Sequence, residues 1–220
     1  MIVPINMRLR PVLALALICT AASLSASDHP LPTAKDASTY PAFDAHTDEQ
    51  VVIAAEPYDT KEKQSIFRID YTKNGFMPVW IVITNNSDRP ISLRDARIDL
   101  ISAADDKIPA AEPEDVERRM THVSNTGKKI PMPAPLPPMG GKPKTPDAKI
   151  EQDFSQFEYA AIAVEPHTTH GGFLFYDVQG LGNTPLRGAL LELRTVRNAD
   201  GKELRYFDIP FDKYLTAQTK

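Results

Sequence analysis

The chain has 220 residues, 42% of them apolar and 25% charged, which provides ample length for a hydrophobic core and excludes general disorder. Its 25 lysines and arginines stand against 29 acidic residues. The resulting net charge of -4 disfavours nucleic acids and anionic membrane surfaces as partners.

Residues 1–27 have the three parts of a secretory signal peptide. Met7-Arg-Leu-Arg10 carries positive charge, Val12 to Cys19 is an unbroken apolar run, and small residues fill Ala21–Ser27. The run is shorter than the roughly 20 residues of a membrane span, and no later segment qualifies as one. We therefore expect cleavage after Ser25 or Ser27 and a periplasmic or extracellular protein. An uncleaved anchor or a short buried helix is the alternative, and Met7 is an alternative start.

Cys19 is the only cysteine of the chain. A lipid anchor at this position needs a small residue before it, and Ile18 is bulky, so lipidation is disfavoured. Removal of the signal peptide leaves a chain without cysteine, which depends on its core rather than on disulfides for stability. It also removes Arg8 and Arg10, which shifts the net charge from -4 to near -6.

The mature chain divides into a leader and one domain. Residues 28–49 are polar, contain several prolines and lack periodicity, which predicts a flexible leader. Residues 50–216 are expected to form a single β-sandwich domain. Its first predicted strand is Gln50–Ala55, and Asp59-Thr-Lys-Glu62 has the spacing of a capping box that opens a short helix through Phe67. Asn74-Gly75 then predicts a turn.

The most apolar stretch of the mature chain is Val79–Thr84. Its residues are all apolar or β-branched, with no polar face in either register, which indicates a strand buried on both sides. We expect Pro78 to open this strand and a turn over Asn85–Pro90 to close it. The segment predicts the centre of the fold.

The middle of the chain mixes strands, helices and a loop. Ile91–Leu93 and the alternating Arg97–Ser102 predict strands, and Glu112–Arg119 predicts a short helix whose charge order suits the helix dipole. Residues 124–147 form a predicted Pro-rich loop insertion, because seven prolines between Lys129 and Pro146 block helix and sheet hydrogen bonds.

The last third begins with a helix after Thr145-Pro-Asp147, whose apolar stripe of Ile150, Phe154 and Phe157 should lie on the sheet. After this helix we expect only strands, turns and loops. The predicted elements are the strand Ala160–Val164, the turn Glu165–Gly172, the strand Phe173–Val178, the loop Gly180–Gly188, the strand Ala189–Val196, the turn Asn198–Gly201 and the strand Glu203–Ile209. Glu192 and Arg194 alternate with leucines, which predicts one solvent-facing side for the final hairpin. At least seven strands without a βαβ rhythm predict a two-sheet antiparallel sandwich.

The C-terminal motifs add a resemblance. Gly172-Phe-Leu-Phe-Tyr-Asp-Val178, followed by a strand and an Asn-x-Asp-Gly hairpin, resembles uncharacterised exported bacterial proteins with an immunoglobulin-like domain. Those families commonly have a Gly-x-Leu-x-Phe strand, preceded by a strand that ends as Ile83-Thr-Asn-Asn-Ser87 does here. Over Val51–Asp212 the resemblance implies a mainly β fold, an immunoglobulin-like antiparallel β-sandwich with two or three short helices and a Pro-rich loop. It transfers no catalytic residue.

Two groups of residues suggest metal chemistry. His167 and His170 are three residues apart, and imidazole is a common metal ligand, but the predicted turn around them supplies no third ligand. Met120 and His122, with Met132 and Met139 downstream, are residue types that bind copper(I), although their spacing is wide. Incidental methionines and a solvated turn are the simpler interpretation.

Two other groups suggest binding. The Pro-rich loop can enter an aromatic groove of a partner, and the loop is flanked by basic residues, namely Lys128, Lys129, Lys142 and Lys144. An insertion without function is the alternative. Aromatic residues can line a ligand pocket, but strand alternation favours the core for all of them, namely Trp80, Phe173, Phe175, Tyr176, Tyr206 and Phe207.

The sequence contains no Gly-x-Ser-x-Gly elbow and no carboxylate pair that can be placed in a cleft. We therefore predict no catalytic, cofactor-binding or metal-binding residue. The predicted function is an exported, non-enzymatic binding protein whose partner is another envelope or extracellular protein. A periplasmic protein that handles copper or zinc is the alternative, and a hydrolase with a site assembled by the fold is a third hypothesis.

Overall fold

The computed structural model describes residues 30–125 and 147–219. In these residues the fold is mainly β, with eleven strands in three antiparallel sheets and four α-helices. The central sheet has the strand order β1 (Phe43–His46), β2 (Val51–Pro57), β3 (Phe76–Asn85), β8 (Thr168–Asp177). The outer sheet has the order β11 (Phe207–Pro210), β9 (Leu190–Arg194), β5 (Arg97–Ile101), β6 (Lys107–Pro109). A small third sheet joins β10 (Arg197–Asn198), β4 (Ile91–Ser92) and β7 (Ala163–Val164).

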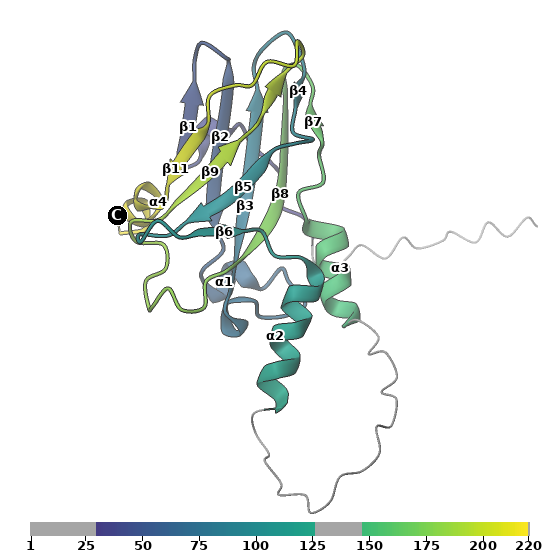
Figure 1. Ribbon diagram of the computed structural model, residues 1–220, viewed down its shortest axis with the longest axis vertical. Helices are drawn as coiled ribbons and strands as arrows, with labels where there is room; N and C mark the ends of the chain where they lie inside the picture. The colour runs from purple at the N-terminus through teal and green to yellow at the C-terminus, as the bar shows by residue number, and fades with distance from the viewer. Residues whose placement is uncertain (1–29, 126–146, 220) are drawn as a thin grey trace, which may run out of the picture.

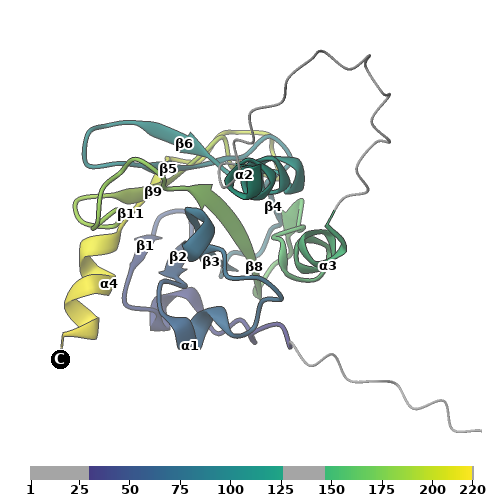
Figure 2. The same cartoon turned by 90° about the horizontal axis from the view of Figure 1, so that it is seen from below.

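The central sheet is buried on both faces, which gives the molecule three layers. On one face Ile81 packs in a core shared with Leu191 and Ile209 of the outer sheet. On the other face Trp80 packs in a second core that includes Phe154 of α3 (Ala148–Phe157). Figures 1 and 2 show the outer sheet on one side of β1, β2, β3 and β8, with α1 (Lys61–Gln64) on the other and α3 beside β8.

The predicted central strand is confirmed and is longer than expected. All ten residues of β3 are buried, because side chains of both registers enter a core. Pro78 lies inside β3 rather than at its start, next to the register pair Pro57–Val79. β2 is confirmed as the neighbour of β3, and it continues to Pro57. Gly75 has a φ of 83° and provides the predicted turn before β3.

The predicted flexible leader over residues 28–49 is wrong for its second half. Ala37–Thr39 forms a 3-10 helix, and the N–H of Ala37 donates to Thr84 Oγ1 at 2.9 Å. Phe43–His46 forms β1, which pairs with β2 along its whole length. At the other end the domain extends past residue 216, because Phe211–Gln218 forms α4, a helix that the sequence did not predict.

The other helices lie where they were expected but differ in length. α1 is shorter than predicted, and Thr60 rather than Asp59 caps it by accepting from the N–H of Lys63. α2 extends over Pro113–Asn125, beyond the predicted end at Arg119. α3 begins after Asp147, whose side chain caps it, and its stripe of Ile150, Phe154 and Phe157 is buried as predicted.

Several predictions in the last third need correction. The strand predicted over Ala160–Val164 is reduced to β7, Ala163–Val164, and the strand predicted over Glu203–Ile209 begins only at Phe207. The turn predicted to reach Gly172 ends earlier, because β8 begins at Thr168 and pairs with β3 along its length. Glu192 points away from the core as alternation predicts, but only 8% of it is exposed, since Lys107 and Arg194 lie against its carboxylate. Tyr206 is 62% exposed instead of packed in the core.

The predicted signal peptide over residues 1–27, with Cys19, and most of the Pro-rich loop lie outside the described residues. Within the described part of the chain, none of the helices has both the length and the apolar character needed to cross a bilayer.

Gly172 lies where the backbone after α3 crosses β8. A Cβ atom at Gly172 would lie 2.4 Å from Tyr159 Cα and 2.8 Å from Tyr159 N. We expect Gly172→Ala to lower the free energy of unfolding by about 3 kcal/mol, since backbone must move to admit the methyl group. Chemical denaturation measures this loss. Adding Tyr159→Ala should give no rescue, because the colliding Cα and N atoms remain; wild-type stability of Gly172→Ala would contradict the close approach.

Candidate functional site

The two large sheets close on one side and open on the other. On the closed side the N–H of Asp208 donates to Asp44 Oδ2 at 3.0 Å, and the His46 ring stacks on Phe207 with 3.9 Å between ring centroids. On the open side β6 and β8 diverge. A backbone crossing joins them: the N–H of Ala111 donates to the carbonyl of Phe175 at 2.7 Å, and beside it the Tyr176 hydroxyl donates to the carbonyl of Ile98 at 3.1 Å. A groove therefore lies on each side of this crossing.

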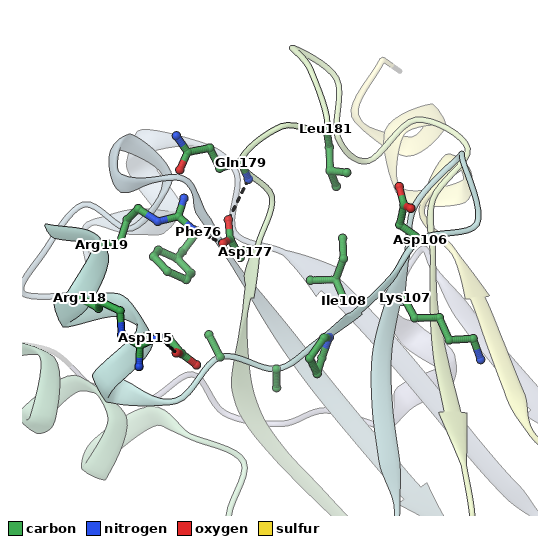
Figure 3. A pocket seen from close by; sticks show the side chains of 13 residues that line it. Phe76, Asp106, Lys107, Ile108, Asp115, Arg118, Arg119, Asp177, Gln179 and Leu181 are labelled. Atoms are coloured by element: carbon green, nitrogen blue, oxygen red, sulfur yellow. Dashed lines mark hydrogen bonds and ion pairs between the residues drawn. The ribbon is translucent and has the colours of Figure 1, made fainter. Parts of the chain in front are cut away.

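We call the larger of these the first groove, and Figure 3 shows it. Its volume is about 710 Å³, and it lies between α2, β6 and the chain that leaves β8. Ile108 of β6 and Leu181 point into it from opposite sides, and the ring of Phe76 lies beneath Arg119. The lining residues are Phe76, Asp106, Lys107, Ile108, Pro109, Ala110, Ala111, Asp115, Arg118, Arg119, Asp177, Gln179 and Leu181.

Charge pairs along α2 hold the wall of the first groove. Arg119 bonds to the Asp177 carboxylate, and its guanidinium carbon lies 5.5 Å from the centroid of the Phe76 ring. Asp177 also accepts from the N–H of Gln179 at 3.0 Å. The residue preceding Arg119, Arg118, has its Nη1 3.1 Å from Asp115 Oδ1, and 67% of the Arg118 side chain is exposed. The two arginines thus present charged hydrogen-bond donors along this wall of the groove.

α2 is fixed to the domain on the face opposite these charges. Val116 is fully buried in the core that contains Phe154 and Trp80, so the helix cannot turn about its axis without exposing it. The sequence places acids in the first turn, and Glu114 and Asp115 oppose the positive end of the helix dipole. Arg118 and Arg119, one turn further along α2, line the first groove.

The edge strand at the groove resists pairing with another strand. β6 has only three residues, with Lys107 exposed and Pro109 unable to donate a backbone hydrogen bond. A short edge with lysine and proline is typical of strands protected against addition. The first groove therefore offers side chains, rather than backbone, to a ligand.

The predicted metal ligands do not assemble. His167 Nε2 lies 3.0 Å from Asp88 Oδ1 at the surface, and His170 lies in β8 opposite Ile83. Met120 is in α2, while nothing is described of the His122 side chain, and Met132 and Met139 lie outside the described residues. In residues 30–125 and 147–219 no group of three or more His, Cys, Asp or Glu is placed to hold a metal ion.

The other predicted binding residues divide into core and surface. Core positions are confirmed for all the aromatic residues except Tyr206, since the remaining five are at most 1% exposed, namely Trp80, Phe173, Phe175, Tyr176 and Phe207. Trp80 Nε1 donates to the hydroxyl of Tyr40 at 3.2 Å, which satisfies its buried N–H. The four lysines around the Pro-rich loop lie outside the described residues.

A polar cluster around Tyr214 was not predicted. Its hydroxyl lies 2.6 Å from Asp59 Oδ1 and 2.9 Å from Lys63 Nζ, which also donates to Glu56 at 2.8 Å. Burial and the neighbouring Asp59 carboxylate raise the pKa of Tyr214 well above its usual range, so the phenol stays protonated. The cluster fastens α4 to the end of β2, and a phenol with a raised pKa is unsuited to act as a base.

Three carboxylates lie side by side on the exposed face of the outer sheet. Asp99, Glu192 and Asp208 occupy matching positions on β5, β9 and β11. Burial raises the pKa of Glu192, but the hydrogen bonds from Arg194 and Lys107 together lower it by more than burial raises it. The net shift of the Glu192 pKa is therefore downward. Asp208 has the opposite shift: burial, then Glu192 and Asp44, raise its pKa. Asp208 Oδ1 is buried without a hydrogen-bond partner in the described part of the chain.

We expect Asp208→Asn to stabilise the protein at pH 7. A carboxyl whose pKa is raised by folding favours the protonated form, so its cost is absent below the ordinary aspartate pKa and appears as pH rises through the raised value. The gain should be about 0.2–1 kcal/mol, the range for like charges on directly opposite strands. Urea denaturation at pH 7 and near pH 3.5 should show the gain at the higher pH alone.

Asp200→Asn is the matched control for this prediction. The pKa of Asp200 is lowered by a hydrogen bond from Arg89, so this carboxylate stabilises the fold at neutral pH. Its amide variant should therefore change stability in the opposite direction, with a loss at pH 7. A loss at pH 7 for Asp208→Asn as well would contradict the inference that the ionised Asp208 carboxylate, beside Glu192 and Asp44, destabilises the fold.

Comparison of the chain with models of protein families, with curated proteins and with solved structures finds no match. The first groove, which combines apolar and charged side chains, is the candidate site.

Proposed function

We propose that this chain is an exported, immunoglobulin-like β-sandwich that binds a segment of another envelope or extracellular protein and is not an enzyme. The observation that carries the proposal is the first groove, a surface cavity of about 710 Å³ with an apolar floor and paired charges on its wall. Apolar surface provides affinity, and a fixed pattern of charges selects the partner.

The charges of the first groove favour binding over catalysis. Asp115 and Asp177 pair with arginines, and Asp106 accepts from the Ser102 hydroxyl at 3.1 Å. Each of these three carboxylates is therefore engaged by a charged or hydrogen-bonding neighbour within the chain. Arg118 is the most exposed of the paired groups, and an acidic residue of the partner can displace Asp115 from it.

Site-specific crosslinking in the native host tests this proposal. A photo-crosslinking amino acid replaces Gln179 on the groove or Lys213 on α4, both of which are exposed. We expect one dominant protein adduct from position 179 and none from position 213. Arg118→Glu should reduce that adduct while the melting temperature stays unchanged, because the side chain is 67% exposed. Equal adducts from both positions, or an adduct insensitive to Arg118→Glu, would refute the groove as the binding site.

A further inference from the structure

The second groove lies on the other side of the Ala111–Phe175 crossing and differs in character from the first. Its volume is about 550 Å³, and most of its lining is apolar. Leu174 of β8 forms part of its floor and also packs against the core between the two sheets. Ile162 stands on its rim with 63% of its surface exposed, the highest value among the large apolar residues described. The groove is thus an opening into the shared core.

The backbone beside the second groove has unused hydrogen-bonding groups. The N–H of Tyr159 donates to Phe173 at 2.9 Å, and the carbonyl of Ile162 accepts from Leu93 at 2.8 Å. Between these two contacts, the N–H and C=O groups of Ala160 and Ala161 have no partner among the described residues. Ala160 is exposed and Ala161 half-buried, so an incoming chain can reach them.

We propose that the second groove binds an extended, apolar segment of a partner protein, which pairs as a strand with Ala160–Ala161 and inserts alternate side chains over Leu174. An extended chain meets both demands of the site, because its backbone bonds to the free N–H and C=O of the alanine that faces it while every second side chain faces the groove. A helix satisfies its own backbone, and an acyl chain has no donors, so either would leave the alanine amides and carbonyls unpaired. This proposal concerns a different surface from the first groove and does not depend on it.

A defined peptide tests the proposal with the full mature chain. The probe is a fluorescent peptide of about eight residues in which valine alternates with threonine between terminal lysines, a strand-sized ligand. We expect saturable binding below about 1 mM by fluorescence anisotropy. By NMR hydrogen exchange, one of the two amides of Ala160 and Ala161 should exchange fast in the free protein and slowly in the complex, because consecutive residues of an extended chain point their N–H groups to opposite edges. The same peptide with every backbone amide N-methylated should not bind.

Matched variants locate the binding site. Ile162→Asp places a charge on the rim and should weaken the peptide by at least about tenfold, whereas Tyr206→Asp, at an equally exposed aromatic residue on another groove, should not. Arg118→Glu should leave peptide binding intact, so failure of the first groove and of the second are separable. No binding at 1 mM, equal binding by the N-methylated peptide or by Ile162→Asp, or binding of a saturated fatty acid in place of the peptide would overturn the proposal.

Discussion

Val82→Asp should prevent folding or leave a protein that melts far below the wild type. Val82 is fully buried at the centre of β3, opposite Ala54 of β2 and Gly171 of β8. Its side chain faces the core that holds Trp80 and Phe173, so the new carboxylate would have no water and no cation beside it. The expected cost is on the order of 5 kcal/mol or more, which equals the whole stability of many domains. Circular dichroism during thermal unfolding measures the outcome.

Two matched variants separate the effect of the buried charge from that of added polarity and from that of a carboxylate as such. Val82→Thr keeps the shape and replaces one methyl group with a hydroxyl, so its cost should be about 1–3 kcal/mol. Ile162→Asp introduces the same carboxylate at an exposed aliphatic residue and should change stability by less than about 0.5 kcal/mol. A melting temperature of Val82→Asp within a few degrees of Ile162→Asp would show that β3 is not buried on both sides.

The elements predicted correctly are those whose burial is visible in their own residues. β3 was found because both of its registers are apolar, and α3 because three large side chains recur at helical spacing. β1 was missed because Phe43-Asp-Ala-His46 has little apolar pattern and gains its structure from pairing with β2. The start of β8 was missed for a similar reason, since Thr168–His170 are polar residues that pair with the end of β3.

Side-chain environments were predicted less well than strands. Alternation put Glu192 on a wet face, which is geometrically right, but Lys107 from β6 covers it, and that neighbour is distant in sequence. Tyr206 was assigned to a strand that begins only at Phe207. The two grooves could not be predicted from the sequence. Their lining residues come from segments that are far apart along the chain and meet only where the two large sheets lie next to each other. Most of the strands and helices could be predicted from the local pattern of apolar residues. The candidate site could not, because it depends on contacts between segments that are remote in the sequence.

Arg68→Ala should destabilise the protein by about 3 kcal/mol, since it leaves a buried carboxylate without its cation. Asp153 on α3 is fully buried, and Arg68 Nη1 donates to its Oδ1 at 2.8 Å. The Arg68 N–H and the Tyr71 hydroxyl also bond to this carboxylate, at 2.9 and 3.3 Å from Oδ2. These contacts tie the chain between α1 and β3 to α3, so urea denaturation should report a loss for the whole domain.

A second substitution, Asp153→Asn, tests whether the lost stability comes from the unpaired carboxylate, because its effect on stability should change sign in the Arg68→Ala background. Asp153→Asn alone should cost about 1–2 kcal/mol by weakening charged hydrogen bonds, but in the Arg68→Ala background it should restore stability, because it removes the unpaired charge. Arg89→Ala is the matched control: it breaks an Arg–Asp pair of similar geometry with Asp200, but both side chains are more than half exposed, so the loss should be much smaller than for Arg68→Ala. If Asp153→Asn lowered the stability of Arg68→Ala further, the buried ion pair would not be what joins α3 to the domain.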